Sequence, residues 1–205
     1  ILVISSVPNE GKSTVSVHLW KMLAEAGFPS VLVDLDLRKS VMKDRLGFQS
    51  EGEITGLDYY LSGLSEYQDV VYETNVNNGY IVPVSNLLEN PSALLEDPRM
   101  GELLDRLAED YRYVIIDSPP LDSVADGALI ASLCDGVLLV VRSGMTSRKL
   151  VRQSLQQLER VHCRLLGMVL NRVETKSRVY QKYYGKYGNY YSDYYGGKIA
   201  EKGEN

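Results

Sequence analysis

Short runs of aliphatic and β-branched residues alternate along this chain with segments of helical periodicity, and this alternation restricts the possible folds most strongly. The runs 1–5, 30–35, 113–117 and 136–141 have the length and composition of buried strands. Strands that are separated by helices form parallel sheets, because each crossover returns the chain to the same end of the sheet. The sequence therefore predicts an α/β fold with a mostly parallel central sheet and helices on both faces.

The remaining elements follow from the same patterns. We expect strands over 80–84 and 165–170 and helices over 56–62, 125–133 and 146–161. Two further helices are expected to begin near Pro91 and Pro98. Gly11 is expected to open the first helix and Gly27 to end it. Its apolar face is predicted to consist of Val15, Leu19, Met22, Leu23 and Ala26.

The first predicted strand runs directly into Gly11-Lys12-Ser13, which is typical of the end of a phosphate-binding loop. Backbone N–H groups at such a helix start surround phosphate oxygens, while the lysine reaches the β/γ-phosphates and the serine hydroxyl binds Mg²⁺. This indicates a P-loop NTPase-like fold. Ser6 replaces the usual first glycine, and an ordinary strand–helix turn with a solvated lysine is the alternative. The predicted ATP-binding residues of the loop are Asn9, Glu10, Gly11, Lys12, Ser13 and Thr14.

Three aspartates come at the ends of predicted strands. Asp34 and Asp36 follow one buried run and Asp117 ends another. Because ligands of open parallel sheets bind at the carboxyl ends of strands, these acids are expected to meet Lys12 in one crevice. Asp34 and Asp36 would share one side if the extended conformation persists. Capping or solvated loop positions are the alternative for each acid taken alone.

Composition excludes several classes of protein. A net charge of −5 argues against nucleic acid as a ligand. Two cysteines, Cys134 and Cys163, are too few for a disulfide framework, which favours a reducing, cytosolic compartment. The chain begins within a strand and without Met, so we expect it to derive from a longer protein.

Tyrosine is unusually abundant, with 15 tyrosines against 2 phenylalanines. Residues 176–205 carry six Lys/Arg and three Asp/Glu, a charge of +3, which leaves −8 on residues 1–175. With almost no aliphatic residues, 176–205 is predicted to be a flexible tail after a single domain over 1–175. Eight of the tyrosines lie within sixteen residues of this tail: Tyr180, Tyr183, Tyr184, Tyr187, Tyr190, Tyr191, Tyr194 and Tyr195.

Three motifs together resemble those of the bacterial tyrosine kinases (BY-kinases) of capsule and exopolysaccharide systems. The loop through Thr14 resembles Walker A, 31–38 (VLVDLDLR) resembles Walker A′, and 114–120 (VIIDSPP) resembles Walker B. The segments 90–95, 126–130, 135–141 and 167–172 are also similar to the family, and the tyrosine cluster resembles its substrate. The resemblance covers residues 1 to about 175 and continues into the cluster.

The resemblance implies autophosphorylation on tyrosine with ATP and Mg²⁺. By motif position, Lys12 would stabilise the transferred phosphoryl group, and Asp34 would orient or accept the tyrosine proton. Ser13, Asp36 and Asp117 would hold the metal, and Asn171 would read the adenine. The eight clustered tyrosines would be the phosphoacceptors, modified in trans within an oligomer.

The resemblance also implies partners. These are a membrane polysaccharide co-polymerase activator, separate or fused upstream, further copies in a ring-shaped homo-oligomer, and a cognate tyrosine phosphatase. The protein would then work in the cytoplasm at the inner face of the plasma membrane. The alternative is a deviant-Walker-type, nucleotide-switched ATPase whose tail only binds. That family places a signature lysine where this chain has Val7.

Overall fold

The computed structural model describes residues 1–47, 54–122 and 126–174. The chain divides into a compact unit, Ile1–Asn171, and a second unit, Arg172–Asn205, of which only 172–174 are described. The eight clustered tyrosines lie outside the described residues. The division into a domain over 1–175 and a flexible tail over 176–205 therefore stays a prediction.

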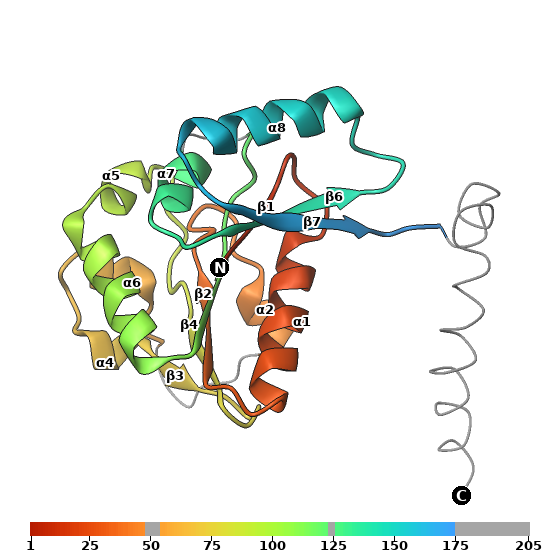
Figure 1. Cartoon of the computed structure of the whole chain (residues 1–205). Helices are drawn as coiled ribbons and strands as arrows, with labels where there is room; N and C mark the ends of the chain where they lie inside the picture. Colours follow the sequence, from red (N-terminus) through yellow and green to blue (C-terminus); the bar gives the residue numbers. More distant parts are fainter. Residues whose placement is uncertain (48–53, 123–125, 175–205) are drawn as a thin grey trace, which may run out of the picture. The chain divides into compact units, whose positions relative to one another are not determined.

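The described part of the first unit contains a seven-stranded sheet in the order β3-β4-β2-β5-β1-β6-β7 (Figure 1). Its strands are β1 (Leu2–Ser5), β2 (Ser30–Asp34), β3 (Tyr72–Glu73), β4 (Gly79–Val82), β5 (Tyr113–Asp117), β6 (Val137–Arg142) and β7 (Leu165–Asn171). Every neighbouring pair is parallel except β3 with β4. The predicted mostly parallel sheet is confirmed, and the short antiparallel β3 was not predicted.

Helices flank this sheet (Figure 1). They are α1 (Lys12–Glu25), α2 (Met42–Leu46), α3 (Leu57–Leu61), α4 (Tyr67–Val70), α5 (Ser92–Leu95), α6 (Pro98–Asp110), α7 (Asp126–Ser132) and α8 (Arg148–Arg160). None of the helices in the described part of the chain is long and apolar enough to cross a membrane. The short helices α2 and α4 were not predicted.

Two hydrophobic cores lie on opposite faces of the sheet, because successive strand residues point to opposite sides. Val3 belongs to the core that includes Trp20 of α1. Ile4 belongs to the other core, with Leu107 of α6 and Leu158 of α8. The prediction of helices on both faces is therefore confirmed.

The predicted apolar face of α1 is confirmed for Val15, Leu19 and Leu23, which are half-buried and pack against the core that contains Trp20. It is wrong for Met22, which is 69% exposed, and for Ala26, which is also exposed. The most deeply buried row of the helix consists of Lys12, Ser13, Ser16, Trp20 and Ala24. Small residues at 16 and 24 let the helix approach the sheet closely, and the Trp20 indole donates to the carbonyl of Ser30 at 3.0 Å.

Candidate active site

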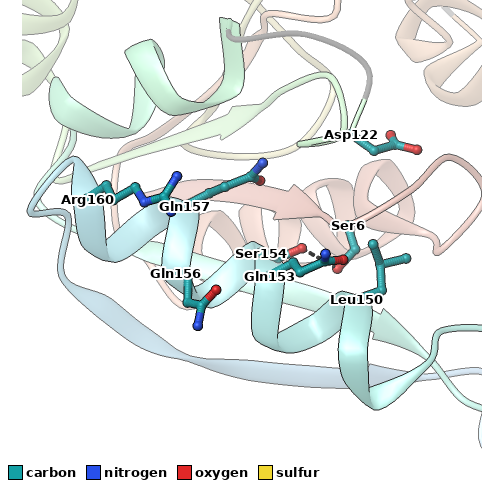
Figure 2. Close-up of a pocket in the computed structure, with 8 residues that line it drawn as sticks. All are labelled: Ser6, Asp122, Leu150, Gln153, Ser154, Gln156, Gln157 and Arg160. Atoms are coloured by element: carbon teal, nitrogen blue, oxygen red, sulfur yellow. Dashed lines mark hydrogen bonds between the residues drawn. The ribbon is translucent and has the colours of Figure 1, made fainter.

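The predicted phosphate loop connects β1 to α1, at the carboxyl end of the central strands. Gly11 adopts a left-handed conformation with φ 95°, which glycine tolerates best. A Cβ at this position would lie 2.1 Å from Nδ2 of Asn171, whose amide donates to the carbonyl of Glu10 at 2.9 Å. The end of β7 therefore supports the loop. On the other side of the loop, Ser154 of α8 donates to the Ser6 hydroxyl at 2.8 Å (Figure 2).

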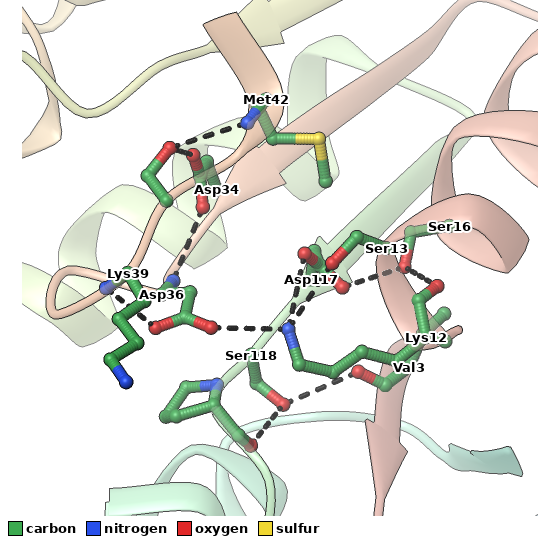
Figure 3. A network of polar contacts seen from close by, with 12 residues as sticks. Val3, Lys12, Ser13, Ser16, Asp34, Asp36, Lys39, Met42, Asp117 and Ser118 are labelled. Carbon is green, nitrogen blue, oxygen red and sulfur yellow. Dashed lines mark hydrogen bonds and ion pairs between the residues drawn. The ribbon is translucent and has the colours of Figure 1, made fainter. Parts of the chain in front are cut away.

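The ends of β1, β2 and β5 converge on Lys12, which begins α1 (Figure 3). Its Nζ lies 3.2 Å from an Asp36 oxygen, 3.4 Å from an Asp117 oxygen and 3.3 Å from the Ser13 hydroxyl. Lys12 is only 9% exposed and Asp117 is 1% exposed. Two buried carboxylates therefore hold the ammonium group at the start of the helix, where its charge is weakly screened.

Asp117 is fixed by hydroxyls as well as by charge. The Ser16 hydroxyl lies 3.0 Å from Asp117 Oδ1 and 3.0 Å from the carbonyl of Lys12. Burial raises the pKa of Asp117, while the Lys12 ammonium and hydrogen bonds from Ser13 and Ser16 lower it, so the net direction is upward. Ser16 was not predicted, and its only sequence signal is its position one helical turn after Lys12.

Asp34 lies beside Asp117 in the sheet register, but among the described residues the ion pairs of Lys12 are with Asp36 and Asp117 and not with Asp34. It is 1% exposed, and its two carboxylate oxygens accept from the amide of Asp36 at 3.2 Å and from the Ser40 hydroxyl. Burial raises the pKa of Asp34 to about 7, and the negative charge of Asp117 adds to this, against the two hydrogen bonds. A carboxylate that titrates near neutral pH is suited to proton transfer.

Asp34 and Asp36 were expected to share one side only if the strand continued through both residues. The strand β2 ends at Asp34, so this condition is not met. The chain turns there, and one oxygen of Asp36 accepts from the amide of Lys39 at 3.1 Å. The other oxygen faces Lys12 (Figure 3). The turn thus separates the two acids, with Asp36 at the lysine and Asp34 at Ser40.

Glu10, a predicted ATP-binding residue, directs its carboxylate into the protein. The side chain is fully buried and accepts from the amides of Val7 at 2.9 Å and Arg142 at 3.1 Å, and from the Thr146 hydroxyl. The carboxylate therefore braces the loop against the connection between β6 and α8. Only the backbone of Glu10 remains suited to a phosphate.

The other two loop residues differ in exposure. Asn9 is exposed with φ 66°, and its carbonyl accepts from the Arg142 guanidinium at 3.3 Å. Thr14 is half-buried, and its hydroxyl accepts from the Arg45 guanidinium at 2.6 Å. Both lie beside the cradle formed by Gly11, Lys12 and Ser13.

The oxygen groups at Lys12 suit magnesium. Within residues 1–47, 54–122 and 126–174, no three His, Cys, Asp or Glu side chains are grouped to hold a metal ion. Mg²⁺ at a phosphate loop needs fewer, because substrate phosphates and waters complete its shell. The Ser13 hydroxyl and the carboxylates of Asp36 and Asp117 are hard oxygen donors of the required kind.

Comparisons with known proteins show the family of this chain. A family model described as an AAA domain matches residues 6–170. Tyrosine-protein kinase CpsD of Streptococcus agalactiae is 41% identical over 184 residues, which cover 89% of this chain and 80% of the relative. The chain belongs to the bacterial tyrosine kinases.

Solved structures place this tyrosine kinase within a wider fold. The kinase domain of the Escherichia coli tyrosine kinase ETK matches with a TM-score of 0.81 at 29% identity, over 86% of this chain and 68% of that chain. The septum site-determining protein MinD from Pyrococcus horikoshii, complexed with Mg-ADP, matches with a TM-score of 0.70 at 23% identity, over 89% and 77%. The second match shows the fold alone, so the comparisons do not favour the nucleotide-switched ATPase over the kinase.

Proposed function

We propose that this tyrosine kinase transfers the γ-phosphoryl group of Mg·ATP to the tyrosines of its own C-terminal cluster. The acceptors would be Tyr180, Tyr183, Tyr184, Tyr187, Tyr190, Tyr191, Tyr194 and Tyr195. The observation that carries the proposal is the buried contact of Lys12 with Asp36 and Asp117 directly behind Gly11. This contact places a lysine that can bind phosphate beside two carboxylates, which follow β2 and end β5.

Binding and charge neutralisation supply most of the catalysis in phosphoryl transfer. The ATP phosphates would lie on the N–H groups of Gly11 to Ser13, at the positive end of α1. Lys12 would neutralise charge that develops on the transferred group, and because it is already fixed, little reorganisation is needed. Bound Mg²⁺ supplies further neutralisation of the phosphates, and Ser13, Asp36 and Asp117 would hold it. Asn171, which lies against the loop, would contact the base.

Asp34 would accept the proton of the attacking tyrosine. One of its oxygens already accepts a hydrogen bond from a hydroxyl, that of Ser40. A phenol that displaces Ser40 would find the same acceptor, with a pKa near 7. Because a free phenol has a pKa of about 10, removal of its proton makes it a better nucleophile.

The family resemblance supports a regulatory role for this reaction. We infer that the kinase controls synthesis, polymerisation and export of a capsular or exopolysaccharide at the inner face of the plasma membrane. Its partners would be a polysaccharide co-polymerase activator, further copies of itself in a ring, and a tyrosine phosphatase. Each phosphate adds a charge of about −1.5 to −2, so several would reverse the +3 charge of residues 176–205.

The test is incubation of the purified chain with Mg·ATP, followed by mapping of phosphate by mass spectrometry. We expect phosphate on Tyr180–Tyr195 that is lost in Lys12→Met and kept in Lys21→Met, since Lys21 is an exposed lysine on the same helix. ATP hydrolysis without phosphotyrosine, with the activator present, would instead identify the switched ATPase whose tail only binds.

A further inference from the structure

The exposed side of α8 carries a row of cations beside the phosphate loop. Arg148 and Lys149 lie in its first turn and Arg152 in the next, and all three are exposed. Among the described residues, no carboxylate forms an ion pair with any of them. Residues 1–175 carry a net charge of −8, so this basic row contrasts with the rest of the domain.

The stability of α8 does not explain these cations. A helix has the positive end of its dipole at the N-terminus, where each cation costs about 0.3–1 kcal/mol and an acid would be favourable. The first turn of α8 contains no acid, and the helix relies on Ser147, whose hydroxyl accepts from the amide of Leu150 at 3.2 Å. The cations therefore call for a function outside the helix.

The position of α8 connects this row to the reaction. Ser154 and Thr146 bind Ser6 and Glu10, at the two ends of the loop that precedes Gly11. The same helix borders a hollow of about 360 Å³ (Figure 2). Its lining includes Gln153, Gln156, Gln157 and Arg160 of α8, together with Ser6 and Asp122. Glutamine amides both donate and accept hydrogen bonds, as a peptide backbone requires.

We propose that Arg148, Lys149, Arg152 and the neighbouring Gln153 and Gln156, together the α8 docking surface, bind the phosphotyrosine-bearing tail of another copy. This rests on the proposed function and deepens it. Guanidinium groups pair with phosphate through two parallel hydrogen bonds, and clusters of arginine are a recurrent phosphopeptide-binding feature. A lipid surface is less suited, because α8, which is described throughout, has no exposed large apolar residue to enter a membrane.

Retention of the first product would favour repeated transfer. Eight tyrosines lie within sixteen residues, so a phosphate bound at α8 keeps several unmodified tyrosines near the loop at high effective concentration. The docking surface would make one encounter yield several phosphates.

The direct test is binding of a labelled peptide with the sequence of residues 178–189, with or without phosphate on Tyr183 and Tyr184, to the full chain without ATP. We expect the phosphorylated peptide to bind about tenfold or more tightly, and R148E/R152E to lose this preference. An acidic residue is favourable at position 148 in the first turn, and Arg152 is exposed, so we expect these substitutions to preserve the fold. The matched control K21E/R112E changes the same charge at two exposed cations elsewhere and should keep the preference.

A second measurement follows the reaction itself. The two proteins are compared by intact mass at equal total phosphate. The chain without substitutions should show mainly molecules with no phosphate and molecules with many phosphates. R148E/R152E should show mainly molecules with one or a few phosphates. The initial rate of first phosphorylation should match between the two. Absence of all phosphotyrosine would refute the proposed function and leave the peptide result standing.

Three results would overturn the docking surface. The first is equal binding of both peptides, or binding that R148E/R152E does not change. The second is arginine-dependent binding to phosphatidylserine vesicles without preference for the phosphorylated peptide, which would assign α8 to a membrane. The third is salt-sensitive self-association that needs the arginines but no phosphate.

Discussion

Among single residues, Asp34 makes the sharpest prediction about the reaction. As a proton acceptor it must be ionised, and burial raises its pKa to about 7. The rate of tyrosine phosphorylation should therefore rise with pH through about 7 and then level. Asp34→Asn should lower the rate by about 10²- to 10⁴-fold and abolish this inflection. A variant that keeps the inflection would remove Asp34 from proton transfer, and initial rates measured at saturating ATP distinguish the outcomes.

The same residue links pH to stability. Between about pH 4 and 7 folded Asp34 keeps a proton that the unfolded chain, with an ordinary pKa of 3.8, has lost. The free energy of unfolding therefore falls as pH rises across this window, and Asp117, whose pKa is also raised, acts in the same direction. Asp34→Asn removes one such contribution, so at pH 8 it should be more stable by on the order of 2–4 kcal/mol. Urea unfolding at pH 5 and 8 measures this, and an equal difference at both pH values would contradict it.

Among the elements, α1 has a glycine near each end, and substitution of each glycine tests whether the two have the same role. Gly11 and Gly27 both have positive φ, 95° and 92°, so alanine at either costs about 1–2 kcal/mol. Only at Gly11 would the new Cβ also strike the Asn171 amide, because nothing lies within 4 Å of the position at Gly27. Gly27→Ala should lose stability and keep ATP affinity, whereas Gly11→Ala should lose both, with ATP affinity lower by about tenfold or more. Equal ATP affinities, measured by titration with a fluorescent ATP analogue, would show that the loop adjusts.

The sequence predicted those elements and contacts that follow from local pattern. Asp36 and Asp117 meet Lys12 as predicted, because parallel strands share one carboxyl edge. Asp34 lies at the same edge but is bound to Ser40. The buried face of α1 was predicted only in part, because the spacing of apolar residues does not reveal the small residues Ser16 and Ala24, which allow a helix to lie close to the sheet. The two-residue strand β3 pairs with β4 through its backbone, and so short a segment has no periodicity to detect.

Contacts between distant segments were not predictable. Ser40 reaches Asp34 only because the chain turns after β2, and Thr146 reaches Glu10 across 136 residues of sequence. Neither serine nor threonine in a loop signals such a partner. These hydroxyls fix the orientation of the two acids, which the motifs alone leave open.

For the whole molecule, charge separation makes transfer between copies sensitive to salt. Residues 176–205 carry +3 and residues 1–175 carry −8, so we expect residues 176–205 of one copy to be attracted to residues 1–175 of another. We expect Lys12→Met chains, which keep every tyrosine, to become phosphorylated when mixed with active chains whose eight clustered tyrosines are replaced by phenylalanine. Each species alone should remain unmodified on these tyrosines, and the two are distinguished by intact mass. Because the attraction is screened by salt, transfer between copies should slow as ionic strength rises above about 0.1 M, where the Debye length falls to about 10 Å. The control is the protein without substitutions, which should be phosphorylated normally. If it is, but the Lys12→Met chain in the mixture carries no phosphate, then each chain modifies only its own tail.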